Sequence, residues 1–500
     1  MSAWIIRGGR VLDAREGRAE PADVLVDGGT IKEIGRPGLA APEGAQLLDA
    51  ADRLLVPGLL NSHTHGHGTL GRGAGDRFTL ELLLNAGPWT GGNYTLEDKA
   101  LAAKLGAVEM VRRGCVAAYD LFAEFPSPTV EGLVAVGGAY AEVGMRAVVA
   151  PMMADRTFWR AIPGLFGALP ADLQAAVDRI VLAPYETSLN VCREILKSWP
   201  YDGTRQRLAL APTIPHHCAD EFLVACRDLA REAGVGLHTH VAESRMQAVV
   251  GVKKYGHTLT AHLDSLGVVG PNFTAAHAVW LDPDDMRRMA DRGASVAHNP
   301  SSNLRLGSGV AAVRAFREHG VNVGLGTDAA TCSDHLNMFE VMRLASGLSR
   351  VSRMDPNDWL GAREVFELAT LGSARALGLG HGEPRLVAGG PADIVLLDLS
   401  DPAWIPFNDP LRQLVFAESG AGVDSVMIDG RLVVHQRRVL TVDTAALRRQ
   451  AEAAVERLRR VNAPARAVSE AAEKVVGAFC LGLSREPYPV DRFVGGAVLR

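Results

Sequence analysis

Short apolar runs alternate with amphipathic stretches through the middle of the chain. Between residues 57 and 384, strand-like apolar runs are separated by segments with helical spacing, among them 96–113, 219–233 and 283–293. Such alternation predicts parallel strands connected by helices. A stretch of more than about 250 residues suits a closed eight-stranded barrel. We therefore expect an α/β fold with a (β/α)8 TIM-like barrel over residues 57–384.

Both ends of the chain show strand patterns instead. Residues 22–27 read as a strand closed by a Gly28-Gly29 turn, and similar patterns return at 392–398 and 425–434. Because two β-rich pieces at opposite ends can pair, we expect residues 1–56 and 385–444 to form one small β-sandwich domain.

The last segment, residues 445–500, falls outside both parts. Residues 445–461 are rich in Ala, Arg and Glu at helical spacing, and a proline-containing tail follows them. We interpret the segment as a C-terminal helical extension, either an exposed helix or a contact within a homo-oligomer.

Composition limits the kinds of partner. The 500 residues are 47% apolar with few aromatic residues, which is typical of a globular protein with a sizeable core. A net charge of -5 and the lack of a Lys/Arg run argue against a nucleic-acid partner. The sequence has neither a signal peptide nor a run long enough to span a membrane, so we expect a cytoplasmic protein that does not bind membranes. Six cysteines without a Cys-x-x-Cys spacing are interpreted as reduced thiols.

Metal-ligating side chains follow several of the apolar runs. His63 and His65 end the run that begins at Leu54, and in a strand two residues so spaced point the same way. Similar endings occur at residues 235–243, which contain His240 and Glu243, at 273–277, and at 321–328. Since the carboxyl ends of parallel strands meet at one mouth of a barrel, these side chains are expected to converge there.

Each of these residues also has an ordinary explanation when taken alone. His240 and Glu243 could form a solvated pair at a strand end, and Asp328 could be a helix N-cap. His277, between apolar neighbours, could be a buried hydrogen-bonded histidine, and His298 could support the loop at 299–302. Their joint occurrence in matching contexts favours a metal site over four separate coincidences.

Four fragments then identify a family resemblance. PGLLNSHTH (57–65), HTHVAE (238–243), VAHNPSSNLRLGSG (296–309) and GTD (326–328) resemble the amidohydrolase superfamily. Within it they look most like the branch of adenosine-type and cytosine-type deaminases and triazine hydrolases. The resemblance covers nearly the whole chain up to about residue 445.

The resemblance implies a role for each of these residues. His63, His65, His240 and Asp328 would hold a divalent metal, zinc or ferrous iron, that activates water. Glu243 would be the general acid/base that protonates a ring nitrogen, His277 would orient the attacking water, and Asp328 would also accept its proton. Two-metal members carry a bridging lysine or carboxylate on a middle strand, but residues 207–214 contain neither. One metal is therefore expected.

The substrate is the least defined part. Adenosine-type members usually carry a glutamate where residues 88–93 read PWTGGN, and a GPHAPYT pattern where residues 211–217 read APTIPHH. After Asp328 the chain reads AATCSD instead of the frequent GAASNN. These departures predict an altered pocket that uses adenosine-type nucleosides poorly. Its expected lining residues are His67, Trp89, His216, His217, His298 and Asn303, although Trp89 could equally be a core residue and His216 a surface turn residue.

Three functions remain open at this point. The favoured one is a hydrolase that displaces ammonia, an amine or a halide from a small nitrogen heterocycle. A cyclic amide or urea-type amidohydrolase is the alternative. A non-catalytic binding protein stabilised by its metal is more remote, because closed structural coordination needs neither Glu243 nor His277.

Overall fold

A computed structural model describes residues 3–379 and 385–494. Eight parallel strands, each hydrogen-bonded to the next along the chain, form the central barrel. They are β6 (Leu59–Thr64), β7 (Cys115–Ala123), β8 (Arg146–Met153), β9 (Gln206–Pro212), β10 (Gly236–Val241), β11 (Phe273–His277), β12 (Ser295–His298) and β13 (Asn322–Leu325). The expected (β/α)8 fold is confirmed.

The barrel strands are buried on both faces. All nine residues of β7 are buried, and their near-continuous apolar sequence is what a strand covered by helices requires. The barrel closes beside the last strand, where the amide of Asp328 donates to the carbonyl of His63 at 2.9 Å. Closure thus places the ends of β6 and β13 next to each other.

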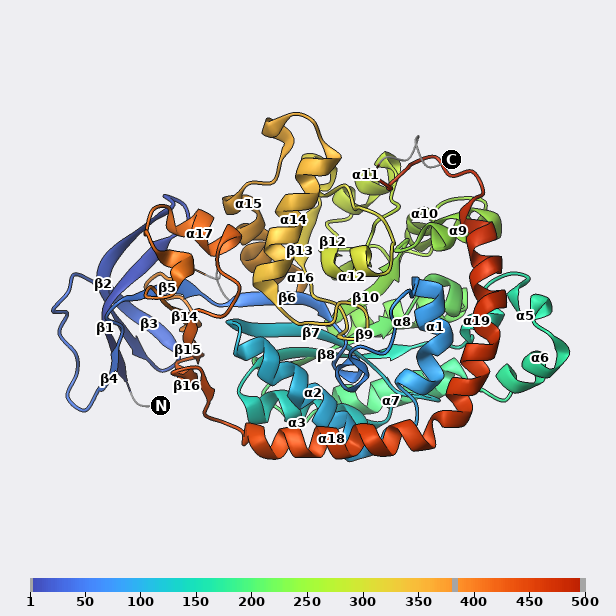
Figure 1. Cartoon of the computed structure of the whole chain (residues 1–500), viewed down its shortest axis with the longest axis horizontal. Coiled ribbons are helices and arrows are strands. Elements are labelled where there is room, and N and C mark those ends of the chain that lie inside the picture. The colour runs from blue at the N-terminus through green and yellow to red at the C-terminus, as the bar shows by residue number, and fades with distance from the viewer. Residues whose placement is uncertain (1–2, 380–384, 495–500) are drawn as a thin grey trace.

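Helices connect the strands and cover the barrel (Figure 1). The longer ones are α1 (Leu80–Thr90), α2 (Leu96–Val111), α3 (Val130–Val143), α7 (Tyr185–Ser198), α8 (Asp220–Ala233), α9 (Arg245–Tyr255), α11 (Pro283–Asp291) and α14 (Met338–Ser352). Shorter ones are α4 (Phe158–Ala161), α5 (Leu165–Ala168), α6 (Ala171–Val177), α10 (Leu259–Ser265), α12 (Pro300–Arg305), α13 (Val313–Glu318), α15 (Ala362–Glu367), α16 (Ser373–Ala376) and α17 (Pro410–Phe416). Sequence signals set several boundaries: Thr95 and Asp98 form a capping box for α2, and Gly144 ends α3 in the left-handed conformation.

The two chain ends build a separate sheet, on the left in Figure 1. Its N-terminal strands are β1 (Trp4–Asp13), β2 (Arg18–Asp27), β3 (Thr30–Gly35), β4 (Gln46–Asp49) and β5 (Arg53–Pro57). Its C-terminal strands are β14 (Ile394–Asp398), β15 (Val423–Ile428), β16 (Arg431–His435) and β17 (Arg438–Val439). The two groups join where β5 pairs antiparallel with β14. A second small core, which includes Ile6, Val24 and Met427, lies against this sheet.

The C-terminal extension differs from the expectation. Helix α18 (Thr444–Val461) is present, but the expected tail is a second helix, α19 (Ala463–Ser484). Its proline, Pro464, lies in the first turn, where the missing amide hydrogen costs no helical hydrogen bond. Ala472, Val476 and Cys480 of α19 are buried against the barrel's helices, so this helix of the extension packs within the chain.

Within residues 3–379 and 385–494, no helix combines the length and the apolar character needed to cross a bilayer.

Candidate active site

The carboxyl ends of the barrel strands bring the candidate ligands together. His63 and His65 lie at the end of β6, His240 on β10 and His277 at the end of β11, while Asp328 follows β13. His65, His240, His277 and Asp328, together with Glu243, line one cavity of about 730 Å³. His63 is completely buried beside them.

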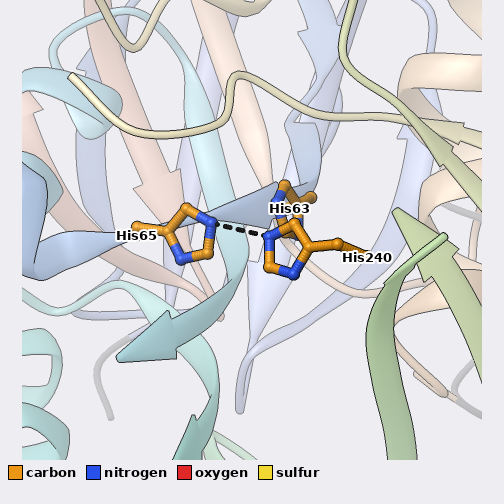
Figure 2. A group of neighbouring side chains, drawn as sticks. All are labelled: His63, His65 and His240. Carbon is orange, nitrogen blue, oxygen red and sulfur yellow. Dashed lines mark hydrogen bonds between the residues drawn. The ribbon is translucent and has the colours of Figure 1, made fainter. Parts of the chain in front are cut away.

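In two of the histidines, His65 and His240, the Nε2 atoms face each other. Nε2 of His65 lies 3.2 Å from Nε2 of His240, as Figure 2 shows. Nδ1 of His65 lies 2.6 Å from the carbonyl of Leu121, and Nδ1 of His240 lies 2.6 Å from the carbonyl of Thr213. Because a carbonyl only accepts, both Nδ1 atoms carry the proton, and both Nε2 atoms present lone pairs to the same point. Such a pair is stabilised by a cation between the two nitrogens.

The other two candidate ligands complete this group. Oδ1 of Asp328 lies 3.3 Å from Nε2 of His65 and 3.6 Å from Nε2 of His63. Both ring nitrogens of His63 are buried without a hydrogen-bond partner. Burial lowers the pKa of His63 to about 3, so its ring is neutral and able to ligate. Two overlapping groups of ligand atoms lie close enough to hold a metal ion, His63 with His65 and His240, and His63 with His277 and Asp328. Imidazole nitrogens and a carboxylate oxygen are donors that fit zinc.

The two acidic groups of the site titrate in opposite directions. Burial and the nearby charges of Asp328 and Glu81 raise the pKa of Glu243 well above its ordinary value. Burial alone would also raise the pKa of Asp328, but the surrounding imidazoles of His63, His277 and His65 lower it well below its ordinary value. The surroundings therefore favour the protonated form of Glu243 and the ionised form of Asp328.

His277 lies between these two carboxyl groups. Its Nε2 is 3.4 Å from Oε2 of Glu243 and 3.6 Å from Oδ2 of Asp328. Its Nδ1 is 2.9 Å from Oδ1 of Asn303, an oxygen that accepts a hydrogen bond. Nδ1 therefore carries the proton, and the Nε2 lone pair faces the cavity.

The backbone is strained where these side chains leave the strands. Ala242, His277, Ala278 and Asp328 adopt left-handed conformations with φ between 47° and 67°. Residues with a side chain rarely adopt this conformation, and where they do they often cluster at functional sites. At His277 and Asp328 the turn directs the side chain into the mouth of the barrel.

The expected substrate contacts divide into two groups. His67 and His217 line the cavity, and burial lowers the pKa of each to about 3. The other four residues lie outside its lining. Asn303 instead accepts from His277, and His298 is buried at the end of β12.

Trp89 and His216 are held by neighbouring parts of the fold. The ring of Trp89 lies under the guanidinium of Arg466 at 5.1 Å, and its carbonyl accepts from Asn462 at 3.0 Å. Nε2 of His216 donates to the carbonyl of Gln247 at 2.9 Å. Their contacts are therefore structural ones in this conformation.

Sequence reasoning did not predict how residues of α1 and α19 contribute to the site. Glu81 of α1 is buried and accepts a 2.6 Å hydrogen bond from Ser244, the residue after Glu243. Pro464, Ala465 and Val468 of α19 line the same cavity as the candidate ligands. No motif in the sequence marked them, because their place depends on how helices distant along the chain pack together.

The cavity wall is mainly apolar, with few carboxylates. Among the described residues that line it, the carboxylates are Glu243, Asp328 and Glu124. The oxygens of Glu124 already accept from Lys99 and from the amide and hydroxyl groups of Thr129. No unpaired carboxylate in this part of the structure is therefore available to bind sugar hydroxyls.

Comparison with known proteins agrees with this geometry. Residues 54–433 match the model of the Amidohydrolase family. The chain is 34% identical over 457 residues to a 5'-deoxyadenosine deaminase of Methanothermobacter thermautotrophicus, covering 91% of this chain and 98% of that one.

Two solved structures share the fold. An adenosine deaminase from Xanthomonas campestris with bound zinc superposes with a TM-score of 0.81 at 29% identity, covering 92% of this chain and 99% of that one. An atrazine chlorohydrolase from Arthrobacter aurescens TC1, complexed with zinc, superposes with a TM-score of 0.80 at 26% identity, covering 90% and 99%.

Proposed function

Because the chain belongs to the amidohydrolase family and is a metal-dependent hydrolase that displaces an amine or halide from a heterocycle, we propose a specific site and substrate class for it. His63, His65, His240 and Asp328 hold one divalent metal, and zinc is the preferred ion. The facing Nε2 atoms of His65 and His240 are the observation that carries this assignment. When bound, the metal supplies Lewis acidity that lowers the pKa of the attacking water.

The chain's own groups then move the protons. Nε2 of His277, with its lone pair toward the cavity, accepts a hydrogen bond from the attacking water and orients it. Glu243, kept protonated by its surroundings, donates its proton to a ring nitrogen beside the carbon under attack. The ionised Asp328 accepts the proton that the water gives up. Water thus adds to the ring carbon as hydroxide. The proton on Asp328 then passes to the leaving amine as the bond between this amine and the ring carbon breaks, and the hydroxyl proton returns to Glu243 as the carbonyl forms. A halide leaves as the anion and needs no proton.

We propose that the substrate is a compact nitrogen heterocycle with an apolar substituent. The polar reacting groups occupy one part of the cavity, and aliphatic and aromatic side chains such as Leu84, Phe158 and Ile180 line another. Burying an apolar group against such side chains contributes roughly 0.8 kcal/mol per CH₂.

A nucleoside is the second candidate substrate. The 34% identity to a 5'-deoxyadenosine deaminase over nearly the whole chain favours it. The pairing of Glu124 with Lys99 argues against it, since this carboxylate is not free for the ribose. Burying a hydroxyl without a hydrogen-bond partner costs more free energy than the apolar contacts around it provide.

A substrate screen tests the proposal. Purified protein loaded with zinc is incubated with aminopurines, aminopyrimidines, chlorotriazines, 5'-deoxyadenosine and cyclic amides, while ammonia, halide and ring opening are followed. We expect release of ammonia, amine or halide from a free heterocycle. Turnover of cyclic amides alone would instead support the amidohydrolase alternative, and no turnover with metal bound would support a binding protein.

A further inference from the structure

The C-terminal helix α19 forms part of the substrate cavity. Pro464, Ala465 and Val468, in its first two turns, are lining residues of the cavity that also contains His240 and Glu243. These residues lie beyond residue 433, where the match to the family model ends. Figure 1 shows α19 at the right, beside α1 and α9.

Polar contacts fix α19 in this position. The side chain of Asn85 in α1 donates to the carbonyl of Ser469 at 2.8 Å, and the hydroxyl of Ser469 donates back to the carbonyl of Asn85 at 2.8 Å. The indole of Trp159 donates to Oδ1 of Asn85 at 3.0 Å. All three side chains are buried, so the register of α19 against α1 and α4 is specified by satisfied hydrogen bonds.

The other end of α19 is tied to the helix that follows Glu243. The guanidinium of Arg245 in α9 donates to the carbonyl of Ser484 at 2.6 Å and to that of Glu486 at 3.2 Å. Lys253 of α9 pairs with Glu486 at 2.7 Å. Helix α19 is thus anchored at both ends to elements that carry or support the site.

Val468, a half-buried residue of α19, packs against an apolar cluster that borders the cavity. Five residues are members both of this cluster and of the cavity lining, and we call them the apolar wall: Leu84, Phe158, Trp159, Ile180 and Val468. They come from α1, α4, the segment after α6, and α19. The candidate metal ligands lie outside this cluster.

We propose that Val468 of α19, as part of the apolar wall, determines how large an apolar substituent the substrate carries. This inference rests on the proposed function for the reaction itself. The effect of the apolar wall can, however, be measured separately as a binding affinity. A substituent that fills the space beside Val468 gains affinity from each buried methylene. A larger residue at position 468 takes that space away.

The test compares Val468→Phe with a matched control on the same helix. Val475 is also half-buried and packs against the same cluster, but it does not line the cavity, so Val475→Phe adds the same bulk elsewhere. Affinities of the zinc-loaded proteins are measured by calorimetry for s-triazines with alkylamino groups from methyl to butyl. Melting temperatures show that each variant is folded, and Val468→Ala serves as a second variant.

For the wild-type protein, affinity should rise with alkyl size. Val468→Phe should weaken binding of the butyl compound by about tenfold or more, within the range for one misfitted apolar group, and leave the methyl compound within about twofold. Val468→Ala should shift the preference toward larger groups, and Val475→Phe should change neither. A wild-type affinity that does not depend on alkyl size, or a Val468→Phe effect equal for all compounds, would overturn the proposal.

Failure of the wall and failure of the reaction are distinguishable. If the size dependence follows position 468 but no compound is hydrolysed, the wall stands and the proposed reaction fails. If hydrolysis occurs with the same size dependence in all variants, the reaction stands and the wall does not.

Discussion

The residues with left-handed backbone conformations around the site show how single positions orient the reacting side chains. Ala242 lies between His240 and Glu243, and its φ of 47° turns the chain so that both side chains line the same cavity. His277 and Asp328 adopt similar values at the ends of their own strands. A left-handed residue with a side chain costs on the order of 1 kcal/mol. The fold therefore accepts local strain in order to place these groups.

Glu243→Gln should keep the metal and lose most of the turnover. The amide has the shape of the protonated acid but cannot transfer a proton, and such groups typically contribute about 100-fold to 10,000-fold. Steady-state rates are measured beside zinc content and melting temperature. A loss of less than roughly tenfold, with zinc retained, would count against the role of Glu243.

Asn303 is expected to act as a positioning residue through His277. Asn303→Leu removes the acceptor of the 2.9 Å hydrogen bond, so the imidazole loses its orientation and kcat should fall by roughly tenfold to 100-fold with a smaller change in KM. Asn303→Asp keeps an acceptor and should restore much of the rate. Equal losses in both variants would show that the packing of Asn303, and not its hydrogen bond, matters.

At the scale of elements, the strand ends could be predicted and the helices around them could not. The period-two spacing of His63 and His65 and the recurring strand endings indicated which side chains meet, because barrel topology forces carboxyl ends to one mouth. Trp89 was expected in a loop, but the structure places it in the last turn of α1, with its ring under Arg466 of α19. Contacts of that kind depend on helix packing across long sequence separations, which no local pattern encodes.

Four ligands from three parts of the barrel should bind a single metal. Elemental analysis of the purified protein should find one tightly bound divalent ion per chain. Dialysis against a chelator should abolish activity, and added zinc should restore it. His65→Ala should lower the zinc content, because it removes one of the two facing Nε2 atoms. Two tightly bound ions would overturn the mononuclear assignment.

The start of α11 should make stability depend on pH. Burial raises the pKa of Asp285, a member of the helix capping box, to about 7. Between its ordinary value of 3.8 and about 7, the folded state binds the proton more tightly than the unfolded chain does, so this group lowers stability as pH rises. The full difference is at most about 4 kcal/mol at 1.36 kcal/mol per pKa unit.

Asp285→Asn removes this titration and keeps a side-chain acceptor. The melting temperature of the wild type, relative to the variant, should therefore increase as pH is lowered from 8 to 5. Melting curves at several pH values check this expectation. A constant difference between the two proteins would show that Asp285 has the same pKa in the folded and unfolded states.

For the whole molecule, the sequence was sufficient for the two main folding units. Alternation of strands and helices predicted the barrel, and matching strand patterns predicted a sheet built from both chain ends. The helical extension was predicted, but its proline-containing part after residue 461 was interpreted as a tail, although proline suits the first turn of a helix such as α19. Helix α19 is buried because Ala472 and Val476 pack against apolar residues of helices that are far away in the sequence.

Adenosine-type nucleosides should be poor substrates for the whole protein. The lining carboxylates are either placed in the reacting group or, as with Glu124, already hydrogen-bonded, so no free carboxylate of the lining is left to pair with the ribose hydroxyls. Turnover of adenosine and 5'-deoxyadenosine is compared with that of adenine and substituted triazines. A nucleoside kcat/KM near 10⁵ M⁻¹s⁻¹ or above, roughly the ordinary range for a good substrate, would show that this expectation is wrong.

The pairing of β5 with β14 also constrains how the protein is made. Strand β5 directly precedes the barrel, but its neighbour β14 leaves the ribosome only after all eight barrel strands have been synthesised. Until then Leu54, Leu55 and Val56 lie on an open sheet edge, and an open apolar edge pairs readily with other chains. A chain whose translation stalls before β14 is made would therefore expose an edge strand that can pair with other chains. Efficient production should depend on uninterrupted translation or on a chaperone that covers this edge.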